Sequence, residues 1–580
     1  MNIKHFTSFT QNRNLVLLFL FLSALIIKLL IFYLVTDPII FYKYPYFAEQ
    51  IANGKDIGER LLDISPFYLL INLLSYYFYG TNWEALVIIQ ILIGSLNCIL
   101  VLLIGEKIFN RTVGVIAAVI IMLYGNLTLI DLTLEPEAIL IFLNSLIILI
   151  SIKAKEASNS KKQSWLWFIT GLLIGLSAIT KPNSLLVLVG VLVWTWLTLK
   201  NKTLWIKSAS LLLLGTTILI APVTIRNYVK FNDFVLVTAD GGKVFYHGNG
   251  PEANGMARAD LPHQGFIEEG SGEPDYAHVL FRKTAKSLSG KMLKPSESSQ
   301  FWTQRALAHI KADFSSWLYL EFKKLCFFWK SYEVHDIDSN YKNYLTVKKL
   351  PLINFGIISV LGILGMILSL KRFRQVFLLH WMVLAYLITV MVFFASSRYR
   401  IPAAPFLAIF AAVSISHIFY LLKEKKIKIL LTIFSFILVF GLFIHFAFQK
   451  EFAKYDQWQK ATRIYYSLGG NISFKKGMYQ EAIDDLKKAI ELEPNFEPAY
   501  NLLGKSYAIL NNYPEAEKNF KKVIELTPGL EEGYLNLGLL YKLRGENDKA
   551  DYFLRKALEI NPNNQKIKKH IKNLSDNIEP

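Results

Sequence analysis

Long runs of apolar residues alternate with short polar segments over the first 450 residues of the chain. A bilayer core about 30 Å thick needs about 20 apolar residues in one helix, and several segments come near this length. They are residues 14–35, 83–105, 112–129, 138–152, 164–180, 184–199, 206–223, 352–370, 375–395, 401–421 and 427–448. The pattern predicts an all-α polytopic membrane protein with about 11 transmembrane helices. The first segment is too long for a removable signal peptide, so we expect it to stay as an anchor.

Basic residues gather in alternate short loops between these segments. One set of loops, with the N-terminal tail, holds Lys4, Arg13, Lys107, Arg111, Lys153, Lys155, Lys161, Lys162, Lys200, Lys202, Lys207, Lys371, Arg372, Arg374, Lys423, Lys425, Lys426 and Lys428. The other short loops hold Lys181, Arg398 and Arg400. Because loops rich in Lys and Arg stay in the cytoplasm, we expect a cytoplasmic N-terminus and an outer C-terminus. The predicted location is the inner (plasma) membrane, as a multi-pass protein.

The same pattern divides the chain into four parts. They are an N-terminal transmembrane core (1–225), an extracytoplasmic loop subdomain of mixed structure (226–350), C-terminal transmembrane helices (351–450) and a polar tail (463–575). Within the loop subdomain, the aromatic segment 316–329 predicts a helix lying on the outer membrane surface.

The polar tail repeats itself with a period of 34 residues. The repeated positions are Pro494, Pro528 and Pro562; Ala482, Ala516 and Ala550; Leu486, Phe520 and Leu554; Gly470, Gly504 and Gly538; and Tyr466, Tyr500 and Tyr534. This spacing is typical of tetratricopeptide repeats (TPRs), in which small residues let two antiparallel helices approach and Pro ends the second helix. About three repeats are predicted, followed by a capping helix at 563–575. Such an array binds peptides or proteins in its groove, although it could also only space or dimerise the protein.

Composition excludes several classes of protein. The 580 residues are 53% hydrophobic and 19% charged, below the ~25% charged residues of soluble domains, so a single soluble globule and a disordered chain are excluded. The net charge of +18 is spread over membrane loops, so nucleic acid is not an expected partner. Cys98 and Cys326 lie in different parts of the chain, and no disulfide framework is expected. The ten His residues form no cluster at metal-ligand spacing, so no metal ligand is assigned.

Acidic residues at the predicted outer membrane face are candidates for catalysis, because charges beside hydrocarbon are costly and mark function. Asp37 follows the first apolar segment, and Asp131, Glu135 and Glu137 share the loop before residue 138. A carboxylate can accept the proton of an attacking hydroxyl. Asp37, Glu135 and Glu137 also fit a helix-capping role.

Basic and polar residues at the same face are candidates for substrate binding. They are Arg398, Arg400, Arg226, Lys181, Tyr44 and His247. Guanidinium forks hold phosphate well, so arginines beside carboxylates suit a lipid-phosphate substrate. The two arginines at 398 and 400 equally fit anchors of helix ends. Lys28, inside the first apolar segment, is expected to extend its ammonium outward to the interface, the alternative being that it lines a cavity.

The order of motifs resembles the glycosyltransferase C superfamily, in particular bacterial family-39-like members with C-terminal TPRs. Protein O-mannosyltransferases and lipid A aminoarabinose transferases share this plan. The resemblance covers nearly the whole chain and rests on a combination of short motifs. They are Tyr44 with Ala48, Pro66-Phe67-Tyr68, Gln90, Gly171 to Leu176, Lys181-Pro182-Asn183, Pro222 to Tyr228, Gly242 to Asn249, Phe328-Trp329 with Tyr332-Glu333, and Arg398-Tyr399-Arg400-Ile401-Pro402.

The resemblance implies transfer of a sugar from a polyprenyl-phosphate carrier to an extracytoplasmic protein, glycan or lipid acceptor. It implies that the TPRs bind a protein partner or the acceptor. It implies no certain cofactor, and whether a divalent cation takes part stays open. The carrier phosphate would meet Arg398 and Arg400, together with Arg226 or Lys181. On this basis Arg400→Ala is expected to abolish transfer and leave expression intact.

One position departs from the family pattern. The family's first-loop acidic residue corresponds to Ile40 in this sequence, and the nearest carboxylate is Asp37. The resemblance therefore leaves three residues for the catalytic base, namely Asp37, Glu135 and Glu137.

Two other functional classes stay open on the sequence. A ligase or polymerase of lipid-linked oligosaccharides would share the membrane plan and release a pyrophosphate lipid. A non-enzymatic TPR membrane scaffold for envelope assembly would tolerate neutralisation of every carboxylate at the outer face.

Overall fold

The computed structural model of the chain describes residues 12–35, 43–199, 201–256, 277–335, 338–562 and 564–575. These ranges contain helices and no strand, with two isolated bridges that pair Tyr124 with Ile353 and Met256 with Ala395. The predicted all-α class is confirmed, and the mixed structure expected at 226–350 is helical in its described part. The chain forms two compact units, residues 1–258 with 289–447, and residues 259–288 with 448–580.

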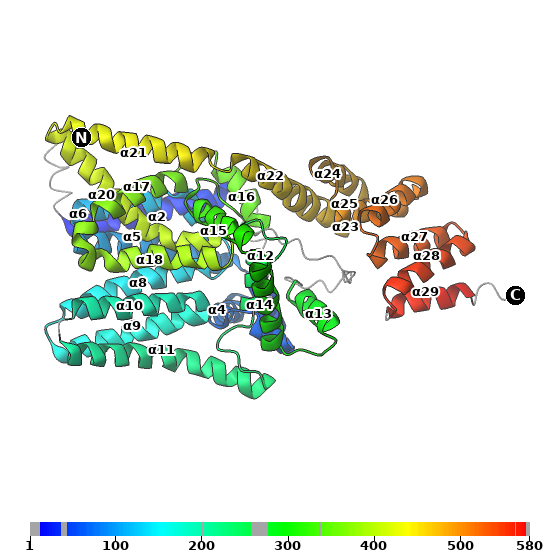
Figure 1. Cartoon of the computed structure of the whole chain (residues 1–580), viewed down its shortest axis with the longest axis horizontal. Helices are drawn as coiled ribbons and strands as arrows, with labels where there is room; N and C mark the ends of the chain where they lie inside the picture. The colour runs from blue at the N-terminus through cyan, green and yellow to red at the C-terminus, as the bar shows by residue number, and fades with distance from the viewer. Residues whose placement is uncertain are drawn as a thin grey trace. The chain divides into compact units, whose positions relative to one another are not determined.

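The first unit is a bundle of apolar helices (Figure 1). In the described ranges, 8 helices are long and apolar enough to cross a membrane, two of them extended by the short turns before them. Their bounds are α2 (Arg13–Leu34), α5 (Glu84–Ile108), α8 (Glu137–Glu156), α9 (Ser160–Thr180), α11 (Lys202–Phe231), α18 (Phe373–Val392), α20 (Ala404–Lys423) and α21 (Ile427–Phe446). Shorter apolar helices are α6 (Arg111–Met122), α10 (Leu185–Thr198) and α17 (Phe355–Leu368). Every apolar segment predicted from the sequence coincides with one of these helices, and the exact number of crossings stays a prediction.

Two predicted boundaries differ from the structure. The segment expected at 112–129 is broken at Leu123, and a separate short helix, α7 (Gly125–Asp131), follows the break. The helix α11 continues past the expected domain boundary at residue 225 and ends at Phe231, before Asn232 in the left-handed conformation with φ 48°. Because Asn tolerates this conformation, it terminates the helix as a C-cap.

The remaining helices of the first unit lie in the loops between the apolar helices. Their bounds are α3 (Lys43–Ala52), α4 (Pro66–Tyr79), α12 (Gly241–Asn249), α14 (Pro295–Ala312), α15 (Phe314–Trp329), α16 (Asp338–Val347) and α19 (Ser397–Arg400). Helix α15 covers the segment 316–329 that the sequence predicts as helical. Helices α12 and α14 pack on each other, as do α3 and α4.

Asparagine side chains begin many of the apolar helices. Asn12, Asn110, Asn159, Asn201 and Asn354 precede α2, α6, α9, α11 and α17, and each side-chain oxygen accepts a backbone N–H of the first turn. An N-cap of this kind satisfies donors that the helix itself leaves open. The caps therefore explain why these helices start where the polar loops end.

Glycine lets helices α9 and α11 approach closely. A Cβ atom at Gly171 would lie 2.4 Å from the Leu212 carbonyl oxygen, and one at Gly215 would lie 2.6 Å from that of Phe168. Apolar burial drives little association between helices in lipid, so close backbone packing of small residues holds such pairs together. This contact holds the middle of α9 against α11, and the candidate site residue Lys181 follows the last residue of α9.

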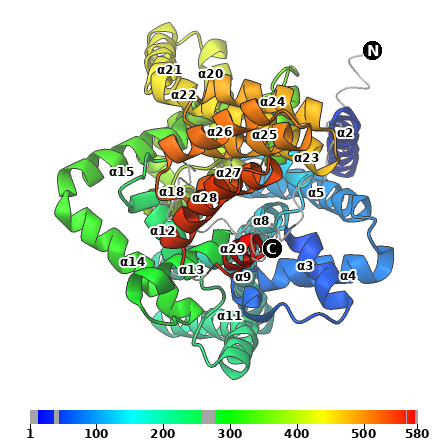
Figure 2. The same cartoon turned by 90° about the vertical axis from the view of Figure 1, so that its right-hand side faces the viewer.

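The second unit contains the repeat array and confirms the predicted TPRs (Figure 2). It comprises α13 (Ala277–Ser289), α22 (Gln449–Gln459), the π-helix η5 (Lys460–Gly470), α23 (Asn471–Lys475), α24 (Tyr479–Leu492), α25 (Glu497–Ile509), α26 (Tyr513–Leu526), α27 (Glu531–Leu543), α28 (Asn547–Ile560) and α29 (Gln565–Ser575). Successive helices pack in pairs, with Ala482, Ala516 and Ala550 fully buried at the same position of each repeat. The predicted capping helix is α29, whose Leu574 is buried against the last repeats.

An Ala516→Leu substitution is expected to loosen the TPRs and leave the membrane bundle unchanged. Ala516 is fully buried beside Phe520 and Leu537, and overpacking a tight core costs about 1–3 kcal/mol. Hydrogen exchange of the full chain should rise in α26 to α28 only. Lys518→Leu adds the same side chain at an exposed position and should show no rise. Equal exchange in both variants would contradict the packing described here.

Candidate active site

The turn between α7 and α8 carries two buried carboxylates. Glu135 lies in the turn and Glu137 opens α8, and both side chains are almost completely buried. The side-chain amide of Gln90 in α5 holds the turn by donating to the carbonyl oxygens of Asp131 and Thr133, at 3.1 and 2.8 Å. Gln90 in turn accepts a hydrogen bond of 2.6 Å from the hydroxyl of Tyr68. The backbone that presents the two carboxylates is therefore fixed from a neighbouring helix.

A buried ion pair supports the same turn from α2. The Lys28 ammonium lies 2.5 Å from the Asp131 carboxylate, and both side chains are shielded from solvent and lipid. The expectation that Lys28 extends outward to the interface is therefore wrong. Removing two charges from water is costly, and a partner at contact distance offsets much of that cost. Asp131 is thereby a structural residue, which leaves Glu135 and Glu137 as the acidic groups of the turn.

Two cations from distant parts of the chain meet these carboxylates. Arg398, in α19, donates from Nη1 to Glu135 Oε2 at 3.1 Å and lies 3.7 Å from Glu137 Oε1. Lys181, at the end of α9, forms an ion pair with Glu137 Oε1. The side chains of Arg398 and Lys181 are 20% and 18% exposed, so the cations border the open side of the cluster. The sequence predicts all four residues as site residues, and the structure brings them together.

One oxygen of each carboxylate accepts no hydrogen bond from the described part of the chain. Glu135 Oε1 and Glu137 Oε2 are buried and have no hydrogen-bond partner among the described residues. Burial raises the pKa of Glu135 to about 7, with Arg398 opposing and the charge of Glu137 reinforcing the shift. A carboxyl group with this pKa can change its protonation state near neutral pH, as a general acid or base requires.

Tyr44 lies beside this cluster, as predicted. Its ring, at the start of α3, packs edge to face on Tyr68 with 4.8 Å between centroids. Burial, and after it the negative charge of Glu135, raise the pKa of Tyr44. Lys43, which the sequence did not suggest as a site residue, acts on Glu135 in the opposite direction by lowering its pKa. Its position directly before Tyr44 is the signal that could have revealed it.

Arg400 differs from the prediction, because both Nη atoms of its guanidinium are hydrogen-bonded inside the protein. Nη1 donates to the carbonyl oxygens of Phe327, Phe328 and Lys330, and Nη2 donates to the Tyr332 carbonyl and to Glu333 Oε2. These bonds are 2.7–3.1 Å long, and the residue is 2% exposed. A buried guanidinium with both Nη atoms engaged is a structural group, so the geometry favours a role in holding the loop after α15 over a contact with substrate phosphate.

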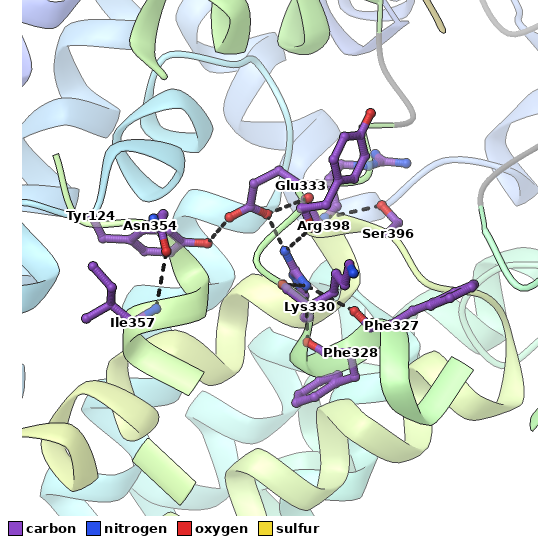
Figure 3. Close-up of polar contacts among 12 residues, drawn as sticks. Tyr124, Phe327, Phe328, Lys330, Glu333, Asn354, Ile357, Ser396 and Arg398 are labelled. Atoms are coloured by element: carbon purple, nitrogen blue, oxygen red, sulfur yellow. Dashed lines mark hydrogen bonds and ion pairs between the residues drawn. The ribbon is translucent and has the colours of Figure 1, made fainter. Parts of the chain in front are cut away.

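Glu333 is the centre of this structural network (Figure 3). Its two oxygens accept hydrogen bonds from the hydroxyls of Tyr124 and Ser397, both at 2.7 Å, in addition to the bond from Arg400. Burial alone would raise the pKa of Glu333, but the neighbouring Arg400 holds it below its ordinary value. Because Ser397 and Arg400 flank Arg398 in α19, the network positions the arginine that contacts Glu135. We refer to Glu333, Arg400, Tyr124 and Ser397 as the clasp.

The other predicted site residues lie elsewhere or outside the described residues. Arg226 is half-buried in α11 and donates to Asn227 Oδ1 at 2.6 and 3.1 Å. His247 lies in α12, and its assignment to the substrate site stays a prediction. Asp37 and Ile40 fall outside the described residues, so the assignment of Asp37 as the catalytic base stays a prediction.

An apolar groove of about 370 Å³ runs between α10 and α11. Its walls include Leu185, Leu188, Ile220, Thr224 and Leu236. Leu185 opens α10, only one short turn after Lys181. The groove therefore starts close to the cationic edge of the cluster and continues along lipid-facing helices.

The described residues do not form a metal centre. No group of three or more His, Cys, Asp or Glu side chains in those ranges is placed to hold a metal ion. Glu135 and Glu137 are bound instead by an arginine and a lysine. A divalent cation therefore stays an untested expectation, and no step below depends on one.

Family models match both parts of the chain. Residues 63–225 match the model described as dolichyl-phosphate-mannose-protein mannosyltransferase, a range that includes Glu135, Glu137 and Lys181. Residues 470–510, 498–530 and 531–564 match three models of tetratricopeptide repeats. None of the curated proteins matches the chain.

Solved structures give more distant matches. An oligosaccharyltransferase from Archaeoglobus fulgidus, in complex with zinc and sulfate, is 14% identical with a TM-score of 0.42, over 77% of this chain and 53% of its own. The same organism's oligosaccharyltransferase AglB, in complex with an inhibitory peptide and a dolichol-phosphate, is 13% identical with a TM-score of 0.42, over 78% of this chain and 56% of its own. The chain thus spans about half the length of these archaeal enzymes. The first TPR of Spaghetti (RPAP3), bound to an HSP90 peptide, is 24% identical with a TM-score of 0.20, over 21% of this chain and 98% of its own.

The family matches and the helical architecture support one coarse assignment. Residues 63–225 resemble the mannosyltransferase family, the C-terminal part carries TPRs, and the described ranges hold apolar helices typical of a multi-pass membrane protein.

Proposed function

We propose that the protein transfers a glycosyl group from a polyprenyl-phosphate carrier to an acceptor hydroxyl or amide at the extracytoplasmic face of the plasma membrane. The observation that carries the proposal is the Oε1 atom of Glu135, which has no hydrogen-bond partner among the described residues. It is buried, belongs to a carboxyl group with a pKa of about 7, and lies at a cluster bordered by two partly exposed cations. This arrangement offers a proton acceptor beside a site for a phosphate anion.

In the proposed reaction, Glu135 Oε1 takes the proton of the acceptor. The acceptor atom bonds to the anomeric carbon of the sugar while the bond from that carbon to the carrier phosphate oxygen breaks. The polyprenyl phosphate leaves with one more negative charge than the bound diester had. Arg398 and Lys181 stabilise this added charge, and their contribution is greater in the transition state than in the ground state.

The groove between α10 and α11 is the proposed path of the isoprenoid tail. It is lined mainly by apolar side chains, and its wall residue Leu185 lies one short turn after Lys181. A carrier whose phosphate meets Lys181 would place its tail along lipid-facing walls and bury little polar surface. The TPRs, on this proposal, bind a protein partner or the acceptor, consistent with the use of such arrays as peptide-binding surfaces.

An Arg398→Ala variant is expected to lower transfer about 100-fold, because removing one preorganised donor to a developing anion has an effect of this size. The assay follows release of polyprenyl phosphate from a labelled polyprenyl-phosphate sugar by the full chain in membranes. Arg305→Ala, which removes an exposed arginine of α14, should leave the rate unchanged.

Two outcomes would count against the proposal. Full activity of the Arg398→Ala variant would show that Arg398 does not bind the carrier phosphate. The thermal stability of the same preparation is the control, because a variant whose clasp is disrupted would be less stable than the unaltered protein. Release of a pyrophosphate lipid from a lipid-linked oligosaccharide, with no reaction of the monophosphate donor, would identify an oligosaccharide ligase instead.

A further inference from the structure

A second cleft lies at the opposite ends of two helices that border the candidate active site. Lys181 precedes α10 and Arg398 follows α18, whereas this cleft lies where α10 ends and where α11 and α18 begin. It encloses about 480 Å³, within the usual range of ligand-binding clefts. Its lining consists of Trp196, Leu197, Leu199, Lys202, Trp205 and Arg374.

The walls of the cleft are tied together by indole groups. Trp194 Nε1, in α10, donates to the carbonyl oxygen of Arg374 at 3.1 Å and so joins α10 to the start of α18. Trp205 Nε1, in α11, donates to the carbonyl oxygen of Leu192 at 3.4 Å and joins α11 to α10. The backbone that carries both cations is therefore held in place by bonds that do not involve their side chains.

The charges in the cleft are of one sign. Lys202 and Arg374 line it, no carboxylate does, and neither cation forms an ion pair with another described residue. Both are exposed at the ends of apolar helices. Trp196 is 63% exposed beside them, and exposed indoles at helix ends are typical of the layer between hydrocarbon and water.

We propose that this cleft binds the headgroup phosphate of an anionic phospholipid. A guanidinium and an ammonium offer charge-assisted donors to the phosphate. The leucines and indoles beside them suit the glycerol and the first carbons of the acyl chains. The occupant is a lipid because the cations lie at the ends of membrane helices, where a lipid headgroup reaches them with its tails in the bilayer. The loop charges predict this end to be cytoplasmic, the leaflet rich in anionic lipids in many membranes.

Native mass spectrometry of the full chain, delipidated in detergent and titrated with phosphatidylglycerol, tests the proposal. The Lys202→Gln/Arg374→Gln variant is expected to bind its tightest lipid about 30-fold more weakly, since each cation near a membrane surface contributes a factor of about five. The control is Lys161→Gln/Lys162→Gln, which removes two exposed lysines at the start of α9 and should bind as the unaltered protein does.

Several results would overturn the proposal. Equal affinity of the two double variants for phosphatidylglycerol would show that the cleft plays no part. Equal affinity of the unaltered protein for phosphatidylglycerol and phosphatidylcholine would show that the net charge of the headgroup is not recognised. Competition by millimolar inorganic phosphate would identify a soluble anion as the ligand. The site does not depend on glycosyl transfer, so inactivity of the protein towards polyprenyl-phosphate donors would leave this test unchanged.

Discussion

A Glu135→Gln variant should lose about 10²–10⁴-fold in the rate of glycosyl transfer and remain folded. This is the usual contribution of a positioned general acid or base. Glutamine has nearly the same shape as Glu135, but its side chain cannot take a proton from the acceptor. The measurement is the initial rate of transfer from a polyprenyl-phosphate sugar in membranes that contain equal amounts of each protein.

The pH dependence of the unaltered protein tests the same assignment. Because burial raises the pKa of Glu135 to about 7, the carboxylate form that accepts a proton is scarce below that pH. Activity should therefore fall as pH drops through about 7, and above this pH it should reach a plateau. The residual activity of Glu135→Gln should lack this transition.

The matched control is Glu84→Gln. Glu84 is an exposed carboxylate in the first turn of α5, so its neutralisation should leave both rate and pH profile unchanged. Full activity of Glu135→Gln would exclude Glu135 as the base. Loss of activity in an Asp37→Asn variant, with Glu135→Gln unaffected, would assign the role to Asp37.

An Arg400→Ala variant should destabilise the whole membrane bundle by about 3–5 kcal/mol, the cost of breaking a buried ion pair. It leaves the Glu333 carboxylate without its cation and removes one donor from each of four carbonyl groups. Thermal unfolding in detergent should shift to lower temperature, and the amount of protein in membranes should fall. This outcome replaces the expectation from sequence that expression stays intact.

Two comparisons separate a structural role from a catalytic one. Arg372→Ala removes an exposed arginine before α18 and should unfold as the unaltered protein does. In the double variant Arg400→Met/Glu333→Gln no charge is left unpaired, so part of the stability should return. An Arg400→Ala protein with unchanged stability and no transfer would restore Arg400 to the phosphate site.

Much of the fold is predictable because membrane helices obey simple rules. Runs of apolar residues mark the helices, and the 34-residue period marks the TPRs, since both patterns arise within short stretches of chain. The break of the third segment at Leu123 was not predicted, because the apolar run 112–123 and the residues Leu127, Leu129 and Ile130 together read as one hydrophobic segment across Tyr124-Gly125-Asn126. Its cause is tertiary, since Ile353 and Glu333 hold the backbone and the side chain of the neighbouring Tyr124.

The charged residues of the site were predictable from the sequence, but the separate structural and functional role of each one was not. Glu135, Glu137, Lys181 and Arg398 are recognisable because charges near hydrocarbon are costly. The same rule selects Arg400, whose carbonyl partners come from a loop about 70 residues earlier. Sequence shows which residues carry charge, whereas only the folded chain shows that one arginine is surrounded by protein and the other borders an opening.

The pairing of Lys28 with Asp131 has a consequence for the first membrane helix. Helix α2 is otherwise apolar, and few of its side chains are buried against the bundle. Packing alone would therefore allow it to rotate about its axis or to shift along it. A turn by a single residue, about 100° around its axis, would carry an ammonium group into lipid and strand a carboxylate behind it. The ion pair of Lys28 with Asp131 thus fixes the rotation of α2 about its axis and its depth in the membrane.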